Sequence, residues 1–494
     1  MKKTDKLLFV PILVLGIYLI VRLINQSQLL HIFPLDYTND ISSYMANLFF
    51  LKECGFHNFC PYWYNGFISF GIFPLGWSLF TLPIYLITNN ILTSTFISII
   101  LMYIISFIFI YIFGKFEKFS LSEVVAFFLF FFANAIAIGD FLRLGRTISM
   151  FAFTLIIGLA VLTFYYRKRR IDSKFFLLFI PLYFLILISH IQEAVLAQFL
   201  IMGLFLTKNN KDKIKLIIFM IIGFVVASFW LLPFIFGLDK THLTNNLQGR
   251  WGLAFSGGPY LLTTIAGIII PIVLLIMFYF YFIYRKKSKK ELLFFLPILL
   301  LNILFLLKLT SYIPILSNIS PHPYTLFFMF FIFFFFFKSD LGKFKNIAYI
   351  LLLFIAIINV VISAIHTPYF ITYTEAEKEM LSLFPYINER FIILESPKTS
   401  YSMAYYSYAP IFHNLSTASG WYKPLTTSEY LDILTTTSED FNKGNCNELV
   451  DSLIKINTTE VLVYGNKCEI LKDCKFKKIR ENGNACLYSI QNNG

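Results

Sequence analysis

The chain has 494 residues, of which 57% are hydrophobic, 19% aromatic and only 14% charged, and its formal net charge is +13. Soluble domains carry about 25% charged residues, so this composition excludes a water-exposed surface over the whole chain and also excludes intrinsic disorder. Repeated apolar runs of 16 or more residues indicate a polytopic helical membrane protein.

Twelve apolar runs follow one another through the first three quarters of the chain. They cover residues 7–24, 72–88, 91–113, 121–139, 147–166, 174–190, 192–207, 214–236, 260–284, 291–308, 319–337 and 345–365. The first run follows two lysines and lacks a small-residue cleavage site, which favours an uncleaved first span over a signal peptide. We therefore expect a membrane domain over residues 1–365.

The positions of the basic loops indicate how many of these runs span the membrane, because Lys and Arg concentrate in cytoplasmic loops. If the run at 72–88 crosses the membrane, the basic loops at 167–170, 208–215 and 285–290 lie opposite the basic N-terminus. If that run is interfacial or re-entrant, every basic loop lies on the N-terminal side. The sequence thus predicts about eleven spans in the cell membrane, a cytoplasmic N-terminus and an extracytoplasmic C-terminus. The basic clusters are then a topology signal, and no nucleic-acid partner is expected.

The same topology places all six cysteines and all four Asn-x-Ser/Thr sequons outside, where disulfides persist and glycosylation occurs. The sequons begin at Asn25, Asn318, Asn414 and Asn457, and the cysteines are Cys54, Cys60, Cys446, Cys468, Cys474 and Cys486. Cys54 and Cys60 are close enough in sequence to be expected to pair. The other four allow two disulfides in any of three pairings.

Two acids, Asp36 and Asp40, directly follow the first span. They share one face if the segment is helical, and a carboxylate held against the bilayer is functional by default. The alternative is helix capping, since Asn39 or Asp40 before Ile41 would start a helix well.

Two further external turns carry clustered charges. Asp140, Arg143 and Arg146 crowd the second external loop. They form either an interfacial salt bridge or a site in which Asp140 meets a metal or acceptor and an arginine holds a phosphate. His190 and Glu193 lie in a turn between two spans that share only 34 residues, so the turn is expected to be recessed. That turn either binds a cation or phosphate or serves as polar helix contact.

Aromatic residues gather in the first loop at Tyr62-Trp63-Tyr64. Trp and Tyr are enriched at membrane interfaces, but such a cluster also suits stacking on sugar rings or a lipid headgroup. Trp63 and Tyr64 are therefore candidate sugar or lipid contacts.

Residues 366–494 carry 12 basic and 15 acidic residues and are expected to form a small extracytoplasmic α/β domain. Thr374 with Glu377 predicts a capped helix, 391–394 and 461–464 read as strands, and 447–456 reads as a helix. The segment 417–422 has either a structural role or a role in covering a membrane cavity or binding glycan.

An acid in a large first external loop, an interfacial helix and a second acid in the next external loop resemble the GT-C superfamily of membrane glycosyltransferases. The likeness is closer to prokaryotic membrane proteins described as 6-pyruvoyl-tetrahydropterin synthase-related and to the YfhO-like group. The matching residues are Asp40, Tyr44, Cys60-Pro61-Tyr62-Trp63-Tyr64-Asn65-Gly66, Phe73-Pro74-Leu75, Gly145-Arg146, Ser189-His190 and Phe229-Trp230-Leu231-Leu232-Pro233-Phe234. The chain departs from the pattern at Tyr44, where His is usual, and at Pro74, where two prolines are common.

The resemblance implies a GT-C-like fold, a polyprenyl-phosphate-linked sugar donor and an external active site with a first-loop Asp as base or metal ligand. On this reading Asp40, with Asp36 and Asp140, is catalytic, and Tyr44 contacts the sugar or lipid. Arg146, Arg143, His190 and Glu193 would hold the donor phosphate. A divalent metal, Mg or Mn, would lie at Asp40 and Asp140.

The acceptor is expected to be a glycan, lipid or protein, and membrane lipid is a further partner. Two alternatives stay open, a transporter or flippase for lipid-linked sugars and a non-catalytic scaffold for surface-glycan assembly. Charges at span ends and the lack of an internal repeat favour the enzyme.

Overall fold

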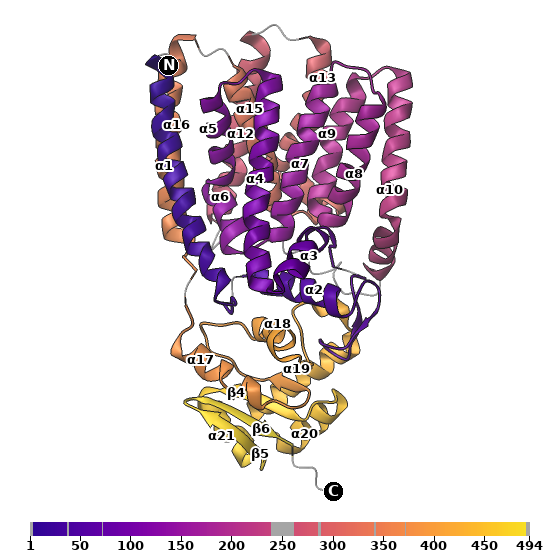
Figure 1. Cartoon of the computed structure of the whole chain (residues 1–494), viewed down its shortest axis with the longest axis vertical. Helices are drawn as coiled ribbons and strands as arrows, with labels where there is room; N and C mark the ends of the chain where they lie inside the picture. Colours follow the sequence, from indigo (N-terminus) through magenta and orange to yellow (C-terminus); the bar gives the residue numbers. More distant parts are fainter. Residues whose placement is uncertain are drawn as a thin grey trace.

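The computed structural model stacks a helical bundle on a smaller terminal domain, with the N-terminus and the terminal domain at opposite ends (Figure 1). It describes residues 3–36, 39–71, 73–238, 261–284, 288–339, 342–370 and 372–490. The sequence predicts that the membrane domain ends near residue 365, where the apolar runs stop. The last bundle helix ends there, at His366.

Eleven helices build the bundle within the described residues. They are α1 (Lys3–Gln26), α4 (Ile91–Glu117), α5 (Leu121–Phe132), α7 (Thr147–Tyr166), α8 (Ser173–Ser189), α9 (Ile191–Thr207), α10 (Asn210–Leu238), α12 (Leu261–Tyr284), α13 (Lys289–Leu306), α15 (Pro321–Lys338) and α16 (Lys345–His366). The other helical pieces before the terminal domain are α2 (Ile41–Glu53), α3 (Gly76–Thr88), α6 (Ala135–Ala137), a π-helical turn (Ile138–Arg143), α14 (Pro314–Ser317) and 3-10 turns at Ser27–Leu30, Leu309–Tyr312 and Gly342–Phe344.

Seven of the described helices are long and apolar enough to cross a membrane, and the bent pair Leu121–Phe132 and Ala135–Arg143 makes up to eight. Helices α8 and α9 have 17 residues each, about 25 Å, which is short against a ~30 Å hydrocarbon layer. The chain is thus multi-pass by helix length and composition. The count of eleven spans and the orientation of the termini stay predictions.

The run at 72–88, which was predicted to lie at the interface, contains α3. This helix has 13 residues and would extend only about 20 Å. Helices α2 and α3 lie at the end of the bundle that faces the terminal domain (Figure 1). A short antiparallel pair, β1 (Phe59–Cys60) and β2 (Phe67–Ile68), completes the first loop. This arrangement places the first loop between the bundle and the terminal domain.

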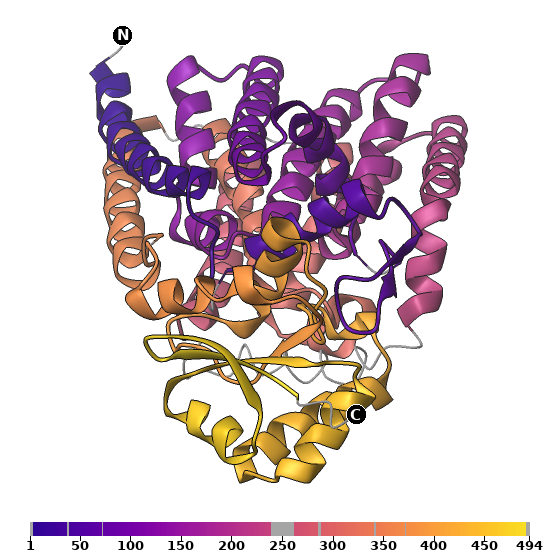
Figure 2. The same ribbon diagram turned by 60° about the horizontal axis from the view of Figure 1, so that its bottom comes forward.

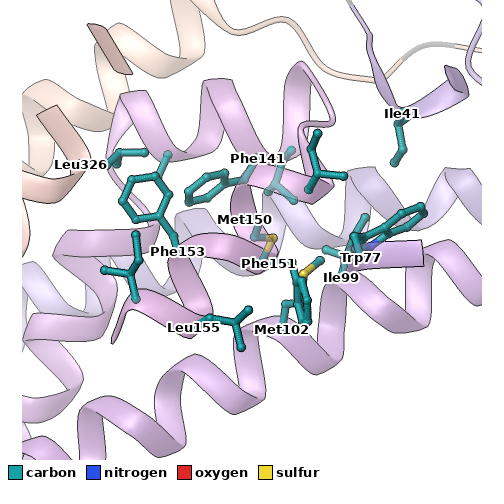
Figure 3. Close-up of a cluster of buried hydrophobic side chains, with 14 of the residues drawn as sticks. Ile41, Trp77, Ile99, Met102, Phe141, Met150, Phe151, Phe153, Leu155 and Leu326 are labelled. Atoms are coloured by element: carbon teal, nitrogen blue, oxygen red, sulfur yellow. The ribbon is translucent and has the colours of Figure 1, made fainter. Parts of the chain in front are cut away.

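The core beneath this junction is made of large apolar side chains. Figure 3 shows Ile41, Trp77, Met150, Phe141 and Phe151 converging from α2, α3, α7 and the π-helical turn. Ile41 and Phe141 are fully buried, and each directly follows an acid, Asp40 and Asp140 respectively. Packing of the two hydrophobic residues therefore fixes the backbone that carries both carboxylates.

The terminal domain is the predicted α/β unit. Its strands form one sheet in the order β3-β4-β6-β5, with β3 parallel to β4 and the other pairs antiparallel. The elements are α17 (Glu375–Leu381), β3 (Phe391–Ile393), α18 (Ser402–His413), α19 (Ser428–Lys443), α20 (Cys446–Lys455), β4 (Glu460–Tyr464), α21 (Cys468–Asp473), β5 (Lys477–Asn482), β6 (Ala485–Ser489) and 3-10 turns at Phe384–Tyr386, Lys423–Leu425 and Gly465–Lys467.

Local signals in this domain were read correctly. Thr374 and Glu377 form the predicted capping box, and β3, β4 and α20 lie where the sequence placed two strands and a helix. The six cysteines form three disulfides, Cys54–Cys60, Cys446–Cys474 and Cys468–Cys486, so one of the three open pairings is selected.

The terminal domain contacts the first loop, and the indigo and orange ribbons lie next to each other in the second view (Figure 2). The indole N–H of Trp63 donates to the Tyr406 carbonyl at 2.7 Å, and the Tyr64 hydroxyl donates to the Gly420 carbonyl at 2.8 Å. Both rings are fully buried. This corrects the prediction that Trp63 and Tyr64 contact sugar or lipid, because neither ring has a free face on which a sugar could stack.

Candidate active site

Asp40 stands immediately before α2, where the alternative reading was a helix cap. Its side chain makes no capping bond; instead the Asn39 side-chain oxygen accepts from the Ile41 N–H at 3.0 Å. The Asp40 backbone N–H donates to the Leu144 carbonyl at 2.7 Å, which joins the first loop to the loop before α7. Because Asn39 does the capping, the Asp40 carboxylate is available for another role.

Asp140 lies in the π-helical turn that follows the bend after α5. Its side chain is fully buried, and its Oδ1 atom lies 2.8 Å from Nη1 of Arg146 and 3.2 Å from Nδ1 of His322. Its Oδ2 atom is buried without a hydrogen-bond partner among the described residues. Single π-helical turns inside α-helical segments are frequent at functional sites.

Arg146 connects the two acids. Its Nε atom lies 3.4 Å from Oδ2 of Asp40, while Nη1 contacts Asp140. Four side chains from three segments therefore form one continuous polar cluster: Asp40, Arg146 with Asp140, and His322. Its accessible side consists of Asp40, Arg146 and His322, whose side chains are 36%, 28% and 31% exposed.

Burial raises the pKa of the Asp40 carboxyl above its ordinary value, and the Arg146 guanidinium opposes this rise. The nearby Asp140 charge raises the pKa of Asp40 further. A carboxylate whose proton affinity is increased while it stays reachable from solvent is suited to accept a proton from a substrate.

Tyr44 lies one helical turn after Asp40 on α2. Burial raises the pKa of its phenol, and the charges of Asp40, Arg146, Asp140 and Glu193 all act on it. Tyr44 therefore lies beside the same cluster, and its ring lies 6.4 Å from that of Trp77; its contact with sugar or lipid stays a prediction.

Asp36 and Arg143 form a separate ion pair beside the cluster that contains Asp40 and Arg146. Nη1 of Arg143 lies 3.1 Å from both carboxylate oxygens of Asp36. The Asp36 backbone forms an isolated bridge with Ser400 of the terminal domain. Asp36 is therefore extended rather than helical, which corrects the idea that Asp36 and Asp40 share a helix face. Arg143 thus pairs with Asp36, whereas Arg146 pairs with Asp40 and Asp140.

The turn between α8 and α9 contains a buried carboxylate. Glu193 is fully buried and contacts both the Ser149 hydroxyl and Nδ1 of His190. The His190 side chain is 21% exposed, and its charge acts on Asp140. Glu193 thus orients His190 beside the cluster and has no access to a phosphate itself, which corrects the phosphate-binding role predicted for Glu193.

His322 and Ser149 were not singled out from the sequence. His322 follows Pro321 at the start of α15, and a proline in the first turn marks a helix start. A histidine in the first turn of an apolar helix, between two prolines, was the signal that could have found it. Ser149 lies in the first turn of α7, three residues after Arg146, and carries no comparable signal.

The described residues contain no group of three or more His, Cys, Asp or Glu side chains placed to hold a metal ion. Asp40 and Asp140 are bridged by the Arg146 guanidinium, so the predicted two-carboxylate metal site does not fit the side chains as they are arranged. No step below depends on a metal.

Comparison with family models finds no matching family, and no curated protein of similar sequence is found. Solved structures do match. The archaeal oligosaccharyltransferase AglB from Archaeoglobus fulgidus, in complex with an inhibitory peptide and a dolichol-phosphate, aligns with a TM-score of 0.55 and 10% identity. The match covers 91% of this chain and 69% of that one.

A structure of the same archaeal enzyme with Zn and sulfate matches with a TM-score of 0.54 and 9% identity, over 90% of this chain and 68% of that one. The arabinofuranosyltransferase AftD from Mycobacteria matches with a TM-score of 0.56 and 12% identity, over 97% of this chain and 40% of that one. Both neighbours are GT-C glycosyltransferases.

The chain has the GT-C fold.

At 9–12% identity the likeness establishes architecture alone. The closer resemblance to the 6-pyruvoyl-tetrahydropterin synthase-related and YfhO-like proteins stays a prediction. In this fold the polar cluster from Asp40 to His322 lies at the junction of bundle, first loop and terminal domain, and it provides the strongest candidate for an active site.

Proposed function

We propose that this GT-C-fold chain is a membrane glycosyltransferase that moves a sugar from a polyprenyl-phosphate-linked donor to a glycan, lipid or protein acceptor. The observation that carries the proposal is the pairing of two acids from different loops through one arginine, Asp40–Arg146–Asp140. The AglB structure determined with a dolichol-phosphate supports a lipid-linked donor for this architecture.

In the proposed reaction Asp40 is the general base. It accepts the proton of the acceptor nucleophile as that atom forms its bond to the anomeric carbon of the sugar. The bond between the anomeric carbon and the phosphate oxygen breaks, and its electron pair stays on the phosphate. A positioned base contributes about 10²–10⁴-fold to such a step.

Arg146 is the proposed phosphate ligand. A guanidinium has five N–H donors, and in Arg146 Nε and Nη1 face the two acids. Among the described residues Nη2 has no hydrogen-bond partner, so its N–H groups are available to the departing phosphate. Asp140 and Asp40 hold the guanidinium plane in place, which a bidentate phosphate contact requires.

His322 and His190 are the proposed supporting groups. His322 contacts Asp140 directly, and Glu193 orients His190 through its Nδ1 atom. The second ring nitrogen of His190 can donate a hydrogen bond to an anion.

The proposal is tested by analysing membranes. Lipid-linked sugars and surface glycans are compared by mass spectrometry in cells that lack the gene and in cells complemented with the wild-type chain or with Asp40→Asn at matched expression. We expect one lipid-linked sugar to accumulate without the gene and with Asp40→Asn, and its glycan product to disappear. Unchanged lipid-linked sugars and glycans in both strains would overturn the proposal, and a scaffold role would then explain the fold.

A further inference from the structure

A second polar cavity lies at the end of the bundle opposite the candidate active site. Helix α7 separates the two, with Arg146 before its first residue and Arg167 after its last, about 30 Å apart over 20 residues. The cavity has a volume of about 360 Å³. It is formed by the turns after α7, between α9 and α10, and before α13.

Positive charge dominates the lining. Six cationic side chains face two acidic ones, Asp212 and Glu291; the cations are Arg167, Lys168, Arg169, Arg170, Lys208 and Lys290. The sequence predicted only short, featureless basic loops here. The structure instead gathers three of those loops around one cavity.

Two of these cationic side chains contact other groups of the protein itself. Arg167 lies 3.2 Å from Glu291 and 3.3 Å from Glu117, and Lys208 donates to the backbone carbonyls of Tyr166 and Arg169. Arg170 and Lys290 are exposed and have no ion-pair partner among the described residues. Lys168 is 73% exposed and lies 3.8 Å from Glu291. Two exposed cations, Arg170 and Lys290, are thus available to an incoming anion.

Two helix starts add to the attraction for an anion. The first turns of α10 and α13, which begin at Asn210 and Lys289, both contribute residues to the lining. The first N–H groups of a helix lack intrahelical acceptors and carry partial positive charge. Here the Asn209 side chain accepts from the Asp212 N–H and the Ser288 carbonyl accepts from the Glu291 N–H, so the helix starts contribute only their partial positive charge.

The neighbouring surface suits acyl chains. Beyond Asp212, α10 exposes a row of isoleucines: Ile214, Ile217, Ile218 and Ile221. A lipid whose headgroup occupied the cavity could lay its chains along this row, whereas a soluble ion would make no use of it.

We propose that this cavity binds the phosphate of an anionic membrane phospholipid. Basic pockets at the ends of membrane helices bind such headgroups, with Lys and Arg supplying the electrostatic attraction. Inorganic phosphate has the same recognition chemistry, so the experiment separates the two sources.

The full-length protein is purified in a neutral detergent, and binding of a fluorescent short-chain phosphatidylglycerol is titrated. Each basic side chain near an anionic surface contributes roughly a fivefold gain in affinity. We therefore expect Arg170→Gln combined with Lys290→Gln to weaken binding by about 25-fold. The matched control is Lys118→Gln with Lys174→Gln, which removes the same charge from exposed residues at this end that do not line the cavity.

A selective loss in the cavity variant supports the site, and equal losses in both double variants would overturn it by showing diffuse attraction. Competition by unlabelled phosphatidylglycerol but not by phosphatidylcholine with the same chains supports the lipid. Competition by inorganic phosphate at equal concentration would contradict the lipid source and assign the cavity to a soluble anion. Failure of the wild-type protein to bind the probe would also overturn the proposal.

Discussion

Arg146 contacts Asp140 with its Nη1 atom at 2.8 Å and turns its Nε atom toward the first-loop acid. The Asp140 side chain is fully buried, whereas the Arg146 side chain is 28% exposed. Arg146 therefore connects the buried Asp140 with the solvent-accessible side of the site. The Arg146 charge lowers the pKa of Asp40. The arginine therefore also sets the pH above which the Asp40 carboxyl is deprotonated and can act as the proposed base.

This coupling predicts a shift in the pH dependence of transfer. A base must be deprotonated, so the rate falls as the pH drops through the pKa of Asp40, which burial places above the ordinary value. In Arg146→Gln the opposing positive charge is lost and the pKa of Asp40 rises. We expect the acid limb of the rate profile to move to higher pH in this variant and to move less in Arg146→Lys. An unchanged acid limb in Arg146→Gln would argue against Asp40 as the base.

The contact between Gly420 and Trp63 predicts a stability effect. A Cβ atom at Gly420 would lie 2.7 Å from Cγ of the buried Trp63 ring, so one of the two must move. We expect Gly420→Ala to lower the free energy of unfolding by about 1–3 kcal/mol, the usual cost of overpacking. Thermal unfolding of the purified protein measures it.

Gly71→Ala is the matched control for this prediction. Its Cβ would lie 3.5 Å from the Ile68 carbonyl oxygen, an ordinary contact, and we expect little change. Equal stability of the two variants would contradict the tight first-loop packing described above.

Glu193→Gln tests the positioning role of the buried carboxylate. Glutamine keeps the shape of the side chain but removes the negative charge that faces His190 and Ser149. We expect a loss of about 10–100-fold in transfer, as for other groups that orient a functional histidine, with little change in the affinity for the acceptor. A variant that lowers expression without lowering specific activity would show a structural role alone.

The orientation of the bundle can be read with a membrane-impermeant thiol reagent. All six cysteines are in disulfides, so an added cysteine is the only free thiol. We expect Lys398→Cys, on the terminal domain, to react in intact cells and Lys118→Cys to react only after the membrane is opened. Labelling of Lys118→Cys in intact cells would overturn the predicted topology.

Much of the architecture could be predicted because its signals are local. Apolar run lengths, the capping box at Thr374 and the charge change near residue 365 each depend on a short stretch of sequence. The 17-residue helices on either side of His190 also follow from spacing. Such signals require no knowledge of distant contacts.

The candidate site was only partly predictable because it depends on contacts between distant segments. Asp40, Asp140 and Arg146 were found as charges near span ends, but the pairing of Asp40 with Arg146 joins residues 106 positions apart. His322 reaches Asp140 across 182 positions. Trp63 was misassigned because nothing in the first loop shows that the terminal domain covers it.

The account depends most directly on Asp40, and one comparison tests it. Sugar transfer from the native lipid-linked donor is measured for the wild-type chain, Asp40→Asn and Asp36→Asn, purified in folded form at equal amounts. We predict that Asp40→Asn loses about 10²–10⁴-fold in rate, the contribution of a general base, whereas Asp36→Asn is affected less because Asp36 pairs with Arg143 beside the site. Near-normal transfer by Asp40→Asn would contradict the assignment of Asp40 as the base.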